Sequence, residues 1–103
     1  MTHKVLILPE AASEAEAAYV YIAKQSPEKA VAWYNGLLDA MFSLDTLPKR
    51  HPVAPESEFL DREVRQFVHG NYRIIYLVED QPKVVRILYV RHGARRRFGE
   101  QGE

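Results

Sequence analysis

The spacing of apolar residues changes once along this chain, from helical to extended, at a proline-rich stretch. Residues 48–61 contain three prolines and little apolar content, which predicts a loop. Before this loop, apolar side chains recur every three or four residues over 11–24 and 27–47, as in amphipathic helices. After it, runs of β-branched and aromatic residues predict strands over 63–68, 72–78 and 84–90, and a short apolar run predicts a further strand over 4–8.

Local signals indicate where some of these elements begin. Ser26 followed by Pro27 is typical of a helix start, with serine as the N-cap and proline in the first turn. Ser13 and Glu16 have the spacing of a capping box, although the alanines before Ser13 also suit a helix. The order β-α-α-β-β-β predicts an α+β fold, an antiparallel sheet with a helical hairpin packed on one face. We expect residues 72–78 to form a central strand, whereas the first strand could pair at either edge.

Length and composition limit the organisation of the chain. Its 103 residues correspond to one domain, which we place at 1–98, with 99–103 as a flexible tail. The sequence contains no cysteine, which excludes disulfides and thiolate metal sites and suits the cytoplasm. No apolar stretch is long enough to span a membrane, and the N-terminus lacks the apolar core of a signal peptide. We therefore expect a cytoplasmic protein without membrane contact.

The net charge of zero conceals a gradient along the chain. Residues 1–47 carry three basic and six acidic groups, whereas residues 81–99 carry six basic groups and no acidic group. Such a basic C-terminal segment could meet nucleic acid or an acidic protein partner.

Few residues suggest catalysis. The four histidines are too far apart for a local metal motif, and no glycine-rich phosphate loop is present, so no metal or cofactor is expected. Glu10, Glu14 and Glu16 near a helix start are explained by the helix dipole. Arg65 and Arg73 are unusual because they lie inside predicted strands. Arg73 could be solvated, could pair with Glu79 or Glu63, or could clamp a phosphate or carboxylate, because the guanidinium fork binds such oxygens in pairs.

Several of these runs together resemble a known family. The pair Val64-Arg65, the string Tyr72-Arg73-Ile74-Ile75-Tyr76 and the ending His92-Gly93 with Arg95 are similar to the RelE/ParE superfamily of toxins from type II toxin–antitoxin modules. The resemblance covers about residues 4–95 and is closer to the ParE-like branch. It implies growth arrest and plasmid stabilisation through inhibition of DNA gyrase and replication, by binding rather than by catalysis. The implied target-binding residues are Arg65, Arg73, Arg91, Arg95, Arg96 and Arg97.

The RelE-like branch of the same superfamily implies a different activity, metal-independent cleavage of messenger RNA on the ribosome. In that alternative, Arg73, Arg95 and Arg65 would be the catalytic residues, with Arg65 one place out of register. The sequence departs from that branch because Phe98 stands where a tyrosine is usual, and because the paired strand lysines are missing. A third alternative is an inactive or antitoxin-locked interaction domain. Replacing Arg73 and Arg95 with alanine is expected to reduce toxicity with the fold intact.

The superfamily also implies a cognate antitoxin, and the second helix suggests where it binds. The apolar stripe of this helix is wide, because Tyr34, Leu38 and Phe42 lie beside the residues expected in the core. The first helix is rich in alanine, whose small side chains cover little of this stripe. A shallow apolar groove should therefore remain along the hairpin, a feature that usually marks a protein contact. We expect the antitoxin to bind at Tyr19, Tyr34, Leu38 and Phe42, to form a hetero-oligomer and to raise the stability of the chain.

Overall fold

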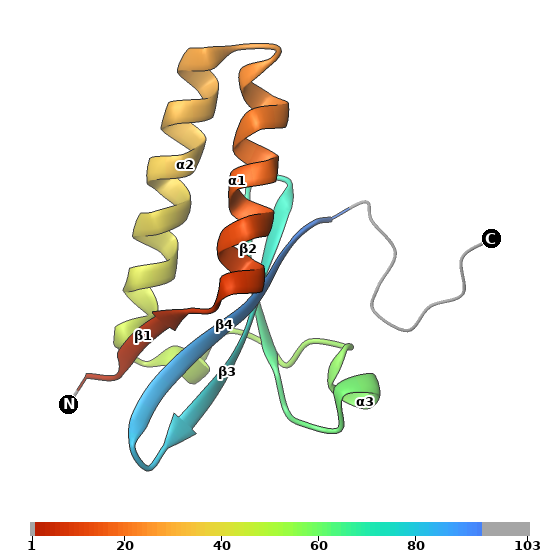
Figure 1. Cartoon of the computed structure of the whole chain (residues 1–103). Coiled ribbons are helices and arrows are strands. Elements are labelled where there is room, and N and C mark those ends of the chain that lie inside the picture. Colours follow the sequence, from red (N-terminus) through yellow and green to blue (C-terminus); the bar gives the residue numbers. More distant parts are fainter. Residues whose placement is uncertain (1, 94–103) are drawn as a thin grey trace.

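The computed structural model describes residues 2–93. Two long helices stand side by side on a twisted sheet, and a short helix lies at the other side of that sheet (Figure 1). The elements in chain order are β1 (Lys4–Ile7), α1 (Pro9–Ala23), α2 (Pro27–Phe42), the short 3-10 helices η1 (Ser43–Asp45) and η2 (Pro48–Arg50), α3 (Ser57–Leu60), β2 (Arg65–His69), β3 (Tyr72–Asp80) and β4 (Lys83–His92). The predicted tail at 99–103 lies outside the described residues, as do Arg95, Arg96, Arg97 and Phe98.

The sheet has the strand order β1-β4-β3-β2. Strands β2, β3 and β4 form consecutive antiparallel hairpins, and the turn between the first two contains Gly70 at a φ of 59°. The predicted α+β class is confirmed, and so is the central position of β3. The prediction of an antiparallel sheet is correct for β2, β3 and β4, whereas β1 lies parallel to β4. This pairing decides the position of the first strand, which the sequence left open.

The helical hairpin follows its local signals closely. At the start of α2 the Ser26 hydroxyl accepts a hydrogen bond from the backbone N–H of Lys29 at 3.2 Å, which confirms the predicted N-cap. Helix α1 begins at Pro9 instead, so Ser13 and Glu16 lie within it and do not form a capping box. The absence of a side chain at Gly36 lets the His69 ring approach α2, because a Cβ there would lie 2.9 Å from His69 Cε1.

The main core lies between the hairpin and the sheet. Small residues of α1 and larger residues of α2 pack on alternate residues of β3 and β4, and the buried members are Ala11, Ala15, Leu37, Met41, Leu44, Ile74, Tyr76, Val85, Ile87 and Val90. Trp33, Tyr34 and Leu38 are partly buried against this cluster. The alanine-rich face of α1 therefore brings that helix close to β4, the strand that carries Arg91.

The opposite face of the sheet has a second, smaller core. Ala54 and Val64 pack against Ile75 and Leu77 of β3, with Leu60 and Tyr89 at the margin. The prediction of a loop at 48–61 is therefore incomplete, because this segment includes η2 and α3, and its later part, from Ala54, covers this face of the sheet. The middle of its backbone is joined to the start of β2, since Ala54 N–H donates to Val64 C=O at 2.7 Å and Gln66 N–H donates to Pro52 C=O at 3.0 Å. Within residues 2–93, no helix is long and apolar enough to cross a membrane.

Candidate functional site

Arg73 lies on the face of the sheet that residues 54–64 cover. Its guanidinium donates to a Glu56 carboxylate oxygen at 2.7 Å and to the Gln66 side-chain oxygen at 2.8 and 3.1 Å. Its side chain is 12% exposed and that of Glu56 only 2%. Among the interpretations of Arg73 from the sequence, pairing with an acid is the one observed, but Glu56 is the partner rather than Glu79 or Glu63. Residue Glu56 precedes α3, so this pair fastens α3 to the sheet.

Arg91 lies directly opposite Arg73 in the β3–β4 register. Two like charges on neighbouring strands would repel each other if neither were compensated. Arg91 Nε donates to Glu14 Oε2 at 2.8 Å, and its guanidinium lies 4.6 Å from the centre of the Tyr89 ring. The positive charges of the two arginines are therefore balanced by two carboxylates, one from α1 and one from the loop before α3.

Arg65 holds the start of segment 48–64. It donates to the backbone carbonyls of Lys49 and His51 at 3.2 and 2.7 Å, and it forms an ion pair with Glu63 at 2.7 Å. Its side chain is 17% exposed. Of the six predicted target-binding arginines, the three inside the described residues are thus already engaged within the fold, and Arg95, Arg96 and Arg97 lie outside those residues. The geometry brings Arg73 and Arg91 together and places Arg65 on the other face of the sheet, because Arg65 lies opposite Tyr76, whose side chain packs in the main core.

Two acidic residues matter that the sequence interpretation missed. Glu14 was explained by the helix dipole, yet its carboxylate contacts both Arg91 and the backbone N–H of Val90, the latter at 2.7 Å. Glu56 lies in a predicted loop and gave no signal at all. It lies two residues after Ala54, which is buried in the second core, and so it is buried on the same face of the sheet.

Three titratable side chains, Tyr76, His51 and Asp80, have shifted pKa values. Burial raises the pKa of Tyr76 to about 12, and its hydroxyl donates to Pro48 C=O at 2.6 Å. His51 stacks on Phe67 at 4.0 Å between ring centres, and burial followed by the nearby Arg50 charge lowers its pKa. Hydrogen bonds from Lys49 and His3 lower the pKa of Asp80. Among the described residues, no group of three or more metal-ligating side chains comes together.

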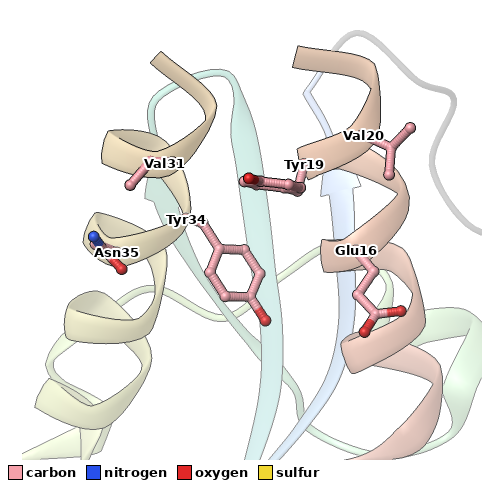
Figure 2. Close-up of a pocket in the computed structure, with 6 residues that line it drawn as sticks. All are labelled: Glu16, Tyr19, Val20, Val31, Tyr34 and Asn35. Carbon is pink, nitrogen blue, oxygen red and sulfur yellow. The ribbon is translucent and has the colours of Figure 1, made fainter. Parts of the chain in front are cut away.

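A groove separates the outer parts of α1 and α2. It has a volume of about 470 Å³ and is lined by Glu16, Tyr19, Val20, Val31, Tyr34 and Asn35. Figure 2 shows Tyr19 and Tyr34 pointing toward each other across it, and their rings meet edge to face with centres 5.7 Å apart. The predicted groove along the hairpin is therefore present. Of the four predicted antitoxin contacts, Tyr19 and Tyr34 line it, Leu38 packs on the core, and Phe42 is 52% exposed near the end of α2.

One family model matches most of the chain. Residues 5–97 match the family model described as the ParE toxin of the type II toxin–antitoxin system, parDE. No protein of curated function gives a significant match.

Solved structures share the fold. The chromosomal ParDE system from P. aeruginosa has a TM-score of 0.69 at 19% identity, over 88% of this chain and 96% of that chain. The RelBE2 toxin–antitoxin complex from Mycobacterium tuberculosis has a TM-score of 0.61 at 22% identity, over 89% and 99% of the two chains. The archaeal RelE–RelB complex from Pyrococcus horikoshii OT3 has a TM-score of 0.61 at 23% identity, over 93% and 100%. Because the ParE model spans most of the sequence and the fold agrees, this chain belongs to the ParE family of toxins of type II toxin–antitoxin systems.

Proposed function

We propose that this chain inhibits DNA gyrase, and so blocks replication, by binding rather than by catalysis, and that a cognate antitoxin neutralises it in the cytoplasm. The observation that carries the proposal is the match to the ParE toxin model over residues 5–97. The most similar fold described above, at a TM-score of 0.69, also comes from a ParDE system.

The state of the arginines supports binding over catalysis. Cleavage of RNA through the ribose 2′-hydroxyl requires cations around the phosphorane and a proton donor and acceptor nearby. Arg73 and Arg65 each pair with a carboxylate at 2.7 Å, which neutralises the positive charge that a phosphorane would need. We therefore assign the target contacts to Arg95, Arg96 and Arg97 at the basic end of the chain, and a mainly structural role to Arg65, Arg73 and Arg91, each of which pairs with a carboxylate.

The hairpin groove is the proposed site of neutralisation. Tyr19 and Tyr34 supply two aromatic rings in an apolar hollow, the kind of residue that often dominates binding energy at protein interfaces. Phe42 continues the apolar surface along α2. An amphipathic helix of the antitoxin would cover this surface, as in other groove-binding helices. Exposed apolar area of this kind also explains why the free chain should be less stable than the complex.

The RelE-like alternative, ribosome-dependent cleavage of messenger RNA, retains one supporting observation. Two of the similar structures are RelB–RelE complexes, each with a TM-score of 0.61. In that alternative the Glu56 carboxylate would have to leave Arg73 before a phosphate could bind. Inhibition of gyrase and cleavage of messenger RNA must therefore be assayed separately on the same purified chain.

The deciding experiment uses the chain purified with and without the protein encoded by the neighbouring reading frame. The proposal expects the free chain to inhibit supercoiling by purified gyrase, to leave messenger RNA intact on translating ribosomes, and to lose its effect when the partner is added. Cleaved messages with unaffected supercoiling would establish the RelE-like alternative. If neither gyrase nor messenger RNA is affected, and cells that are induced to express the chain grow normally, the chain is an inactive interaction domain.

A further inference from the structure

The helical hairpin is acidic, whereas the C-terminal segment of the chain is basic. Helix α1 carries three glutamates and no basic residue, and α2 carries two acidic residues and one lysine. One of these carboxylates, Glu14, is paired with Arg91 at 2.8 Å. Another, Glu16, is exposed and has no ion pair or hydrogen bond within residues 2–93. The groove between α1 and α2 thus contains a carboxylate that the fold itself does not use.

The surroundings of Glu16 contain no cation that could neutralise it. Ion pairs along a helix form between residues three or four positions apart, and the residues at those distances from Glu16 are alanine, serine, tyrosine and valine. Across the groove, the lining residues of α2 are Val31, Tyr34 and Asn35, all uncharged. Among the described residues that line the groove, Glu16 is therefore the charged one.

The groove has an apolar end and a polar end. Because α1 and α2 form a hairpin, Val20 near the end of α1 and Val31 near the start of α2 lie at the same end of the groove. Figure 2 shows the Tyr34 hydroxyl and the Glu16 carboxylate toward the other end. A negative charge and a phenol therefore lie one helical turn away from an apolar surface.

This combination suits the side chain of an arginine. A guanidinium can donate two parallel hydrogen bonds to a carboxylate and can stack on a tyrosine ring. Its apolar stem can pack on Tyr19, whose ring centre lies 5.7 Å from that of Tyr34. A helix that covers the groove also removes water from Glu16. A carboxylate covered in this way is costly unless a cation pairs with it, so a partner with a neutral or acidic residue at this place is disfavoured.

We propose that the antitoxin helix places a basic residue, best an arginine, against Glu16 and the Tyr34 ring, and that Glu16 thereby selects the cognate antitoxin. That the groove holds an antitoxin rests on the proposed function; the basic residue follows from the charge of the groove. Four residues of a helix rise about 6 Å, so an apolar residue three or four positions from the arginine would lie opposite the two valines. Specificity arises because any other partner leaves the Glu16 carboxylate covered and unpaired.

The test is an exchange of charges, measured as the Kd between the purified chain and the protein encoded by the neighbouring reading frame. Glu16→Gln should weaken binding about tenfold and make it less sensitive to salt, because the ion pair is lost. Glu16→Lys should weaken binding more than about 100-fold, because two like charges then meet. When the basic residues of the partner are replaced with glutamate one at a time, one variant should restore binding to Glu16→Lys. A change in the partner would not repair a merely structural defect in α1.

The matched control is Glu58→Gln, which removes the same charge from α3 on the other side of the sheet. Its Kd should stay within about twofold of the wild-type value, because the charge is far from the groove and screened. Glu16 has no partner to lose within the described residues, so Glu16→Gln should melt at the wild-type temperature. Should Glu16→Lys not fold, the affinity and salt dependence of Glu16→Gln against Glu58→Gln decide the question.

The remaining outcomes separate this inference from the proposed function. If Glu16→Gln binds as tightly as Glu58→Gln, or if no partner variant restores binding to a folded Glu16→Lys, Glu16 does not select the antitoxin, while the proposed function stands. If the wild-type chain does not bind its neighbour at all, neutralisation by that protein is wrong, and the role of Glu16 is wrong with it. Restored binding together with unaffected gyrase would support the role of Glu16 and refute the proposed target.

Discussion

Replacing Arg73 with alanine should cost this domain a large share of its stability. The substitution removes three hydrogen bonds, one to Glu56 and two to Gln66, and leaves the Glu56 carboxylate with 2% exposure beside an empty space. Breaking a buried ion pair from one side typically costs about 3–5 kcal/mol. The total free energy of unfolding of a small domain is only about 5–15 kcal/mol. We therefore no longer expect the fold to remain intact when alanine replaces Arg73. Any loss of toxicity in that variant must be compared with the fraction of the chain that is unfolded.

The matched control is Arg86→Ala. Arg86 also pairs with a glutamate of the sheet, Glu79, at 3.3 Å, but the two side chains are 37% and 32% exposed. A surface pair of this kind contributes about 0–1 kcal/mol. Urea unfolding followed by the fluorescence of the single tryptophan, Trp33, gives the free energy of each variant. Adding Glu56→Ala to Arg73→Ala should recover part of the loss, because the buried carboxylate that lost its contact with Arg73 is then removed as well.

The reasoning about the buried pair would be refuted by one clear result. If Arg73→Ala lost less than about 1 kcal/mol, as expected for the exposed control, the Glu56–Arg73 contact would be no more than a surface interaction. Equal losses for the single and double variants would likewise show that the two side chains do not depend on each other.

Three further predictions concern other parts of the molecule. The pKa of Tyr76 is raised from 10 to about 12, so the folded state holds this proton more tightly, and the free energy of unfolding should fall as pH rises from about 10 to 12; urea unfolding at several pH values should show this fall, and Tyr76→Phe should remove it. Gly36→Ala should stabilise a His69→Ala background by about 1 kcal/mol in thermal melts, because helix propensity favours alanine once the ring is gone; no gain there would mean that another contact requires this glycine. Tyr34→Ala should weaken antitoxin binding by about 2 kcal/mol, roughly 30-fold in Kd by calorimetry, whereas the exposed Phe59→Ala on α3 should not; equal affinities for the two variants would move the antitoxin away from the hairpin groove.

The elements themselves could be predicted because their signals are local. Ser26 caps α2 through a backbone group three residues away, and Gly70 meets the left-handed conformation that the β2–β3 turn requires. Periodicity likewise reports which face of a segment is apolar without reference to its neighbours. The order of helices and strands, and the family resemblance carried by the β2–β4 strings, were therefore accessible from the sequence.

The site depended on contacts between residues that are distant in the chain. Arg73 was singled out from the sequence, but its partner Glu56 lies 17 residues away, and the partner of Arg91, Glu14, lies 77 residues away. The same applies to β1, whose parallel pairing with β4 joins the two ends of the domain. A sequence pattern records how often apolar residues recur, whereas these contacts depend on which packing of the elements buries most apolar surface while giving each buried charge a partner. The tertiary structure alone therefore decides that the sheet arginines of the described residues are compensated within the fold, and that Glu14 binds the backbone N–H of Val90.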